Sequence, residues 1–178
     1  MVYLYGYGRN ETDRVLRYDR EAAVAYAHEW AMGRNPRYYD FEEIGGDCTN
    51  FASQVLYAGS NQMNFTPLYG WYYINSYNRT PSWTGVEYLY RFLISNKGAG
   101  PFAVEIDITE IMPGDIIQIS FANNVFSHSP VVVSAGIPPS IGSIRIAAHT
   151  YDRDNYPLYE YNWQALRFLH IQGVNARG

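Results

Sequence analysis

The chain has 178 residues, of which 47% are apolar and 17% are charged, and its formal net charge is −4. This composition is typical of a folded globular domain and excludes a disordered tail. The net negative charge lacks the basic footprint of a protein that binds nucleic acid or an anionic membrane. With a single cysteine, the chain has no internal disulfide framework, so its fold must depend on its core.

No stretch reaches the roughly 18 consecutive apolar residues expected of a transmembrane helix. The start of the chain, MVYLYGYGRNETDR, lacks the basic segment and apolar run of a secretion signal. The sequence has no repeat, charge block or low-complexity linker. It therefore predicts one domain over residues 18–178 after an N-terminal extension over residues 1–17, and leaves localisation and oligomeric state open.

The first half of the chain favours helices. The segment YDREAAVAYAHEWAMGR predicts a helix over residues 18–34, with Asp19 as the N-cap and Gly33 just past the end. A second helix is predicted from Cys48 to about Gly59, because apolar residues recur there at helical spacing.

Residues 60–83 predict a long aromatic loop, since prolines, glycine and asparagines interrupt any regular pattern. The T-x-x-E motif over residues 84–87 has the pattern of a capping box and predicts a third helix that ends at about Ser95.

The second half favours strands. A turn at Met112-Pro113-Gly114-Asp115 is followed by four segments rich in β-branched residues, IIQISF, HSPVVVSAG, IRIAAHT and LRFLHI. Because helices come first and strands second, the expected fold class is α+β, with N-terminal helices packed on an antiparallel sheet.

The only cysteine lies in GGDCTNFASQ, where Asp47 is suited to the N-cap and Cys48 to the first helical position. A lone cysteine is often an inert part of the core. At a helix N-terminus, however, unpaired N–H groups and the macrodipole favour the thiolate, so we expect a lowered thiol pKa. The Gly45-Gly46 pair would let a substrate approach, and the Cys48 amide could stabilise an oxyanion.

A thiolate that cleaves an amide needs a proton carrier for the departing nitrogen, and histidine is suited to this near neutral pH. His128 is predicted to begin the strand HSPVVV after an open polar loop, which favours it as the base. His28 lies within the first helix and His170 within the last strand, and no neighbouring signal supports either.

The third position of the site is less well determined by the residues. His149 ends the next strand, IRIAAH, and could orient His128 if the two strands pair. Asp152 is a rival for that role, and Asp154 a weaker one. Trp71 and Trp83 could border a groove or cover the core, and the second interpretation is favoured.

These motifs together resemble a known family. GGDCTNFASQ is similar to the signature of the "putative amidase domain" family of the papain-like superfamily, which also includes NlpC-type peptidases and CHAP amidases. YDREAAVAYAHEWA resembles that family's opening helix, MPGDIIQISF its turn and strand, and HSPVVV its histidine strand. The resemblance extends from about residue 18 to residue 170 and implies a papain-like fold.

The resemblance also implies roles for individual residues. Cys48 corresponds to the nucleophile, His128 to the general base and acid, and His149 to the orienting residue. Tyr38 or Tyr39 corresponds to a tyrosine near the nucleophile in the cell-wall peptidases, and Asp47 remains a structural cap.

The sequence therefore predicts a cysteine amidase or peptidase that forms a thioester acyl-enzyme, without a cofactor or a metal. The residues support an amide or ester carbonyl as the target. The resemblance narrows the substrate to peptide or peptidoglycan-like material. It leaves the localisation open, with part of a secreted or cell-wall-associated bacterial protein as one option. An acyltransferase using the same residues, or a non-catalytic module that binds glycan or peptide, remains an alternative.

Overall fold

Four α-helices lie in the described part of the chain up to Ser95, where the sequence predicts three helices. The computed structural model describes residues 14–176, so most of the predicted N-terminal extension lies outside the described residues. The helices are α1 (Arg20–Trp30), α2 (Cys48–Ser60), α3 (Pro81–Thr84) and α4 (Val86–Ser95). Short 3-10 turns form η1 (Glu42–Ile44), η2 (Ile108–Glu110) and η3 (Leu158–Glu160).

The predicted cap of the first helix is correct, whereas the predicted cap of the third helix is not. The carboxylate of Asp19 accepts a hydrogen bond from the Ala22 N–H at 3.0 Å, which confirms the predicted cap of α1. The predicted capping box of the third helix is wrong, because Thr84 ends α3 and Gly85 precedes α4 without a side-chain cap. Pro81 explains this difference, since proline favours the first position of a helix and starts a separate short one there.

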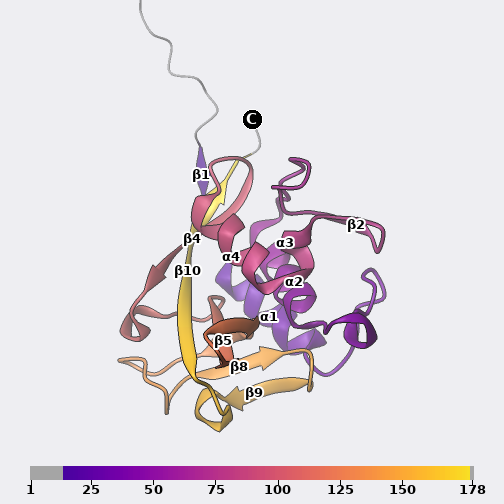
Figure 1. Cartoon of the computed structure of the whole chain (residues 1–178). Coiled ribbons are helices and arrows are strands. Elements are labelled where there is room, and N and C mark those ends of the chain that lie inside the picture. The colour runs from indigo at the N-terminus through magenta and orange to yellow at the C-terminus, as the bar shows by residue number, and fades with distance from the viewer. Residues whose placement is uncertain (1–13, 177–178) are drawn as a thin grey trace, which may run out of the picture.

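An eight-stranded sheet forms among the described residues, mostly from the second half of the chain together with the short strand β1 near its start (Figure 1). Its central order is β1-β10-β5-β7-β8-β9, with β4 also paired to β10 and β6 to β5, and every pairing is antiparallel. This confirms the predicted mixture of helices and antiparallel sheet. The strands are β1 (Val15–Leu16), β4 (Gly100–Ile106), β5 (Ile116–Ala122), β6 (Val125–His128), β7 (Val131–Ser134), β8 (Arg145–Ala148), β9 (Arg153–Pro157) and β10 (Ala165–Asn175).

Several strands lie where the sequence predicts none, including β4, β9 and most of β6. Val15 and Leu16, assigned to the N-terminal extension, pair with the end of β10. The predicted loop over residues 60–83 contains a small hairpin of β2 (Tyr73–Asn75) and β3 (Asn78–Arg79).

The predicted strand HSPVVVSAG is divided in two. His128 ends β6, which pairs with β5, and the next strand begins only at Val131. Pro130 lies in the gap, and it has no N–H to donate to a continuous ladder. His128 therefore belongs to the hairpin with β5 and does not begin a strand as predicted.

Hydrophobic clusters lie on both faces of the sheet, because alternate residues of a strand point to opposite faces. Phe51, Leu56, Leu89 and Leu93 of the helices are buried in one cluster with Val131 and Ala147 of the sheet. The other cluster contains Ile117, Ile119, Val132 and Ile146, packed with Leu158 of η3. The helices α1, α2 and α4 thus cover one face (Figure 1), and the start of α2 lies close to the strand ends.

Candidate active site

A tight turn of glycines leads into Cys48. Gly45 and Gly46 have φ angles of 126° and 93°, in the region that L side chains rarely adopt. A Cβ at Gly46 would also lie 3.1 Å from Oγ1 of Thr150. The Asp47 N–H donates to the same Thr150 oxygen at 2.9 Å. The turn before the cysteine is therefore held against the loop that follows β8.

The Asp47 side chain does not cap α2, although its residue occupies the N-cap position. Its Oδ1 accepts from the Phe41 N–H at 2.9 Å and from Nδ2 of Asn50 at 2.8 Å. Its Oδ2 lies 2.5 Å from Nδ1 of His149. The predicted side-chain cap is thus wrong. The Asp47 carboxylate is wholly buried. It binds the preceding loop and a histidine, and it accepts no hydrogen bond from the backbone N–H groups at the start of α2.

The thiol of Cys48 lies against the two residues that flank His128. Its Sγ is 4.0 Å from the carbonyl oxygen of Ser127, and the Ser129 N–H is directed at it. On its own helix, Sγ lies 3.8 Å from the hydroxyl of Thr49. Cys48 itself is 7% exposed, whereas Ser127 is exposed. The sulfur therefore lies in polar surroundings just beneath the surface, at the end of β6.

His128 is buried at the same strand end, with 5% of its surface exposed. Its Nε2 lies 3.1 Å from the hydroxyl of Tyr161, and the two ring centroids are 5.5 Å apart. The ring of Phe121, itself 44% exposed, lies 6.1 Å from the His128 ring. The imidazole is thus enclosed by aromatic rings and has one polar partner.

Burial sets the charge of both groups. Desolvation raises the pKa of the Cys48 thiol, and this exceeds the opposite effect of the Ser129 and Thr49 N–H groups. Desolvation also lowers the pKa of His128 to about 4. The expected lowered thiol pKa is therefore contradicted, because burial outweighs the helix N-terminus. At neutral pH the resting site holds an uncharged thiol and an uncharged imidazole.

His149 lies apart from His128. Both of its ring nitrogens have other partners: Asp47, and the carbonyl oxygen of Trp30 at 2.9 Å. Its ring stacks on Phe51 of α2, with centroids 4.2 Å apart. The sequence predicted that His149 would orient His128 if their strands paired. The register of the strands explains why the two side chains do not meet.

Strands β7 and β8 do pair, as the prediction required, with Val131 opposite Ala147. Continuing that antiparallel register by two residues puts His149 opposite Ser129, not opposite His128. Neighbouring residues of an extended chain point to opposite sides. His149 therefore faces α2, while His128 faces Phe121 and Tyr161.

The two aspartates proposed for the orienting role also have other partners. Asp152 forms an ion pair with Arg34, with Nη2 and Oδ1 3.0 Å apart. Asp154 lies 2.7 Å from Nδ1 of His28, on the exposed side of α1. Neither carboxylate contacts His128 among the hydrogen bonds of residues 14–176.

The aromatic residues considered for a groove are mostly part of the core. Trp71 and Trp83 have no exposed surface, and their indole N–H groups donate to Ser53 at 3.0 Å and Asn50 at 2.9 Å. This excludes both from lining a groove in this conformation and agrees with the favoured interpretation. Tyr38 stacks on Trp83 at 5.9 Å, whereas Tyr39 is 49% exposed.

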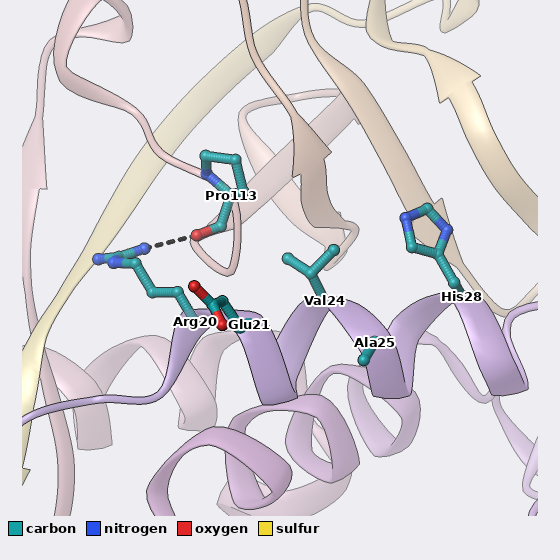
Figure 2. Close-up of a pocket in the computed structure, with 6 residues that line it drawn as sticks. All are labelled: Arg20, Glu21, Val24, Ala25, His28 and Pro113. Carbon is teal, nitrogen blue, oxygen red and sulfur yellow. Dashed lines mark hydrogen bonds between the residues drawn. The ribbon is translucent and has the colours of Figure 1, made fainter.

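A pocket of about 400 Å³ lies elsewhere, over the outer face of α1 (Figure 2). Arg20, Glu21, Val24 and His28 line it, together with Pro113 from the turn before β5. Figure 2 shows the Arg20 guanidinium directed at the Pro113 carbonyl, which accepts its hydrogen bond at 2.8 Å. No residue of this pocket belongs to the cluster around Cys48.

Sequence reasoning missed Tyr161, the only described polar side chain hydrogen bonded to His128. It lies in the stretch LYEYNW, which contains no motif. The sequence feature that comes closest to indicating Tyr161 is the tyrosine-rich turn after Pro157. That feature does not indicate which strand end the turn approaches. Pairing of β8 with β9, followed by η3, brings the residue back to His128.

The comparisons with known proteins agree with this picture at the level of the family. Residues 17–171 match the family described as "Putative amidase domain", and the chain belongs to this family. The description indicates an amidase, which is a hydrolase. A curated relative, "Uncharacterized protein YhbB" of Bacillus subtilis (strain 168), is 37% identical over 159 residues.

The match with YhbB covers 85% of this chain and 48% of the relative, so the chain spans about half of that protein's length. No solved structure matches the chain. Among the described residues, no helix is both long enough and apolar enough to cross a membrane, and no cluster of three or more histidine, cysteine or acidic side chains could hold a metal ion.

Proposed function

We propose that the protein is a cysteine-dependent amidase of papain-like type, with Cys48 as the nucleophile and His128 as the general base and acid. One observation carries this proposal: the thiol at the first position of α2 lies against Ser127 and Ser129, the two neighbours of His128. An inert core cysteine is surrounded by apolar side chains. The Cys48 sulfur lies instead beside the Thr49 hydroxyl and the backbone of Ser127 and Ser129.

The uncharged resting pair fits general-base catalysis. As Sγ of Cys48 attacks a carbonyl carbon, the thiol proton passes to His128, and the carbonyl oxygen becomes an oxyanion. The N–H of Cys48 lies at the start of α2 and has no hydrogen bond recorded among the described residues, so it is a suitable oxyanion donor.

The rest of the cycle balances with the same two groups. His128 returns its proton to the departing amine, the C–N bond breaks, and an acyl thioester remains on Cys48. Water then gives a proton to His128 and attacks the thioester, and the thiolate leaves and regains the proton. The products are a carboxylic acid and an amine, and the enzyme is unchanged.

The substrate proposed is an amide bond in the peptide part of bacterial cell wall. The family description supports an amidase, and the resemblance to cell-wall peptidases supports the narrower class. The net charge of −4 provides no attraction to anionic wall polymers, which favours recognition of the peptide.

The test is digestion of purified peptidoglycan by the full chain and by Cys48→Ala and Cys48→Ser variants. Wild-type protein should release new amino and carboxyl termini, identified by mass spectrometry, and both variants should release none. Release by Cys48→Ala at the wild-type rate would exclude Cys48 as the nucleophile. Competition between water and a peptide amine distinguishes transfer from hydrolysis, because an acyltransferase would give the new amide as its main product.

A further inference from the structure

The imidazole proposed as the base has a polar partner that the sequence did not indicate. Nε2 of His128 lies 3.1 Å from the hydroxyl of Tyr161. The three side chains considered for this role lie elsewhere: His149 binds Asp47, Asp152 binds Arg34, and Asp154 binds His28.

The fold holds the Tyr161 ring in place. Its backbone N–H donates to the carbonyl oxygen of Leu158 at 3.2 Å, which closes the 3-10 turn η3. The ring packs edge-on against Tyr156, with centroids 5.6 Å apart, and lies 6.2 Å from Phe121. Because the ring is fixed on three sides, the position of its hydroxyl is set before any substrate binds.

The hydroxyl also remains uncharged. Burial raises the pKa of Tyr161 above its ordinary value, and negative charge on Cys48 raises it further. A neutral phenol oxygen can accept a hydrogen bond from an imidazole N–H without attracting the proton as a carboxylate would.

We infer that Tyr161 is the positioning residue of His128: its oxygen accepts a hydrogen bond from Nε2–H and so leaves Nδ1 free to take the proton of Cys48. This inference rests on the proposed function, because it assigns a role within the same site. The two tautomers of a neutral imidazole differ in which nitrogen carries the proton. Only the Nε2–H tautomer has its lone pair on Nδ1, the nitrogen that lacks a recorded partner among the described residues.

The test compares Tyr161→Phe with Tyr159→Phe in the full chain. Both variants lose one phenol oxygen from the same turn and keep the ring, so the packing is preserved. Tyr159 is 50% exposed and its recorded ring contact is with Arg145, which makes it a matched control. Thermal unfolding of each variant shows whether it is folded.

The first readout needs no substrate. Nitrogen-15 NMR at pH 7, with His128 assigned by its loss in His128→Gln, should show protonated Nε2 and unprotonated Nδ1 in the wild type. Tyr161→Phe should give a mixture of the tautomers, and Tyr159→Phe should not differ from the wild type. A proton found on Nδ1 in the wild type, or a tautomer unchanged in Tyr161→Phe, would overturn the inference.

The second readout is acylation of Cys48 by p-nitrophenyl acetate, followed as a burst of p-nitrophenol. We expect Tyr161→Phe to lower the acylation rate about tenfold to a hundredfold, with little change in the concentration for half-maximal rate. Tyr159→Phe should stay within about twofold of the wild type. A Tyr161→Phe burst equal to that of the wild type would contradict the positioning role.

The two proposals fail in different ways. If wild-type protein shows no burst that depends on Cys48, the proposed function fails, whatever the tautomer. If the burst depends on Cys48 and His128 but not on Tyr161, the proposed function stands and the role of Tyr161 is excluded.

Discussion

Two buried histidines, His128 at the end of β6 and His149 just after β8, have different surroundings. His149 has partners at both ring nitrogens, Asp47 and the Trp30 carbonyl, and stacks on Phe51. His128 has one partner, the neutral phenol of Tyr161. Burial lowers the pKa of His128 to about 4, because no nearby negative charge offsets the desolvation.

The difference teaches how burial can serve stability in one place and reactivity in another. A histidine bonded at both nitrogens is fixed, and it has no free lone pair to accept a proton. One bonded at a single nitrogen is oriented and still has a lone pair available. Sequence spacing made both residues candidates for the site. Both ring nitrogens of His149 have partners, whereas only Nε2 of His128 has one among residues 14–176, as the proposed mechanism requires.

The largest expected effect comes from removing the lone pair of His128. His128→Gln keeps a neutral polar group of similar size, and we expect it to lower the rate of Cys48 acylation by about 10³-fold or more, since His128 is the base of the proposed mechanism. The measurement is the p-nitrophenol burst in variant and wild type. The melting temperature of His128→Gln should stay within a few degrees of that of the wild type. Retention of the wild-type rate would remove His128 from the mechanism.

The second effect should be on stability and should belong to His149. His149→Ala leaves the buried Asp47 carboxylate without one partner and opens a cavity beside Phe51, so the free energy of unfolding should fall by about 3 kcal/mol or more. Urea denaturation measures this change. The control is His28→Ala, which removes an exposed pair with Asp154 and should cost less than about 1 kcal/mol.

The opposite pattern would reverse the comparison. If His149→Ala remained as stable as the wild type but lost acylation of Cys48, His149 would belong to the reactive group, as the sequence first suggested.

The third effect is a dependence of stability on pH that belongs to His128. Its pKa is about 4 in the folded protein and about 6.5 in an unfolded chain. Between these values the unfolded chain binds a proton that the folded protein does not. The contribution is therefore fully present above pH 6.5 and is lost as the pH falls toward 4, by about 3 kcal/mol in total.

The measurement that isolates this contribution is urea denaturation of wild type and His128→Gln at pH 7 and pH 4.5. Other groups titrate in both proteins alike, so the difference between them reports on His128. Wild-type protein should lose about 2–3 kcal/mol more than the variant between these pH values. Equal losses would mean that burial does not lower the pKa of His128.

Local signals predicted the three longer helices and the strands β5, β7, β8 and β10, but not β4, β6 or β9. Asp19 caps α1 as expected, and the change of periodicity marked where helices give way to strands. Cys48 begins α2 for the same local reason, a glycine turn followed by apolar residues at helical spacing. Such features depend on a few neighbouring residues, so a single sequence contains them.

Pairing and solvation were harder to predict. Pro130 was visible in the sequence, and its missing N–H could have indicated that HSPVVV is two strands. The register of β7 with β8, which turns His149 away from His128, is fixed by tertiary packing. The direction of the shift in the Cys48 thiol pKa depends on how deeply the thiol is buried. The helix N-terminus alone predicted a lowered pKa, whereas burial raises it.

The smallest expected effect concerns Asp152, the alternative third residue. Its carboxylate pairs with Arg34, and about 30% of each side chain is exposed. Such half-exposed pairs contribute about 0.2–1 kcal/mol, so Asp152→Asn should lower the free energy of unfolding by less than about 1 kcal/mol. The same variant should acylate Cys48 within about twofold of the wild-type rate, because the carboxylate does not contact His128. A loss of tenfold or more, without a matching loss of stability, would place Asp152 behind the imidazole and displace Tyr161 from that position.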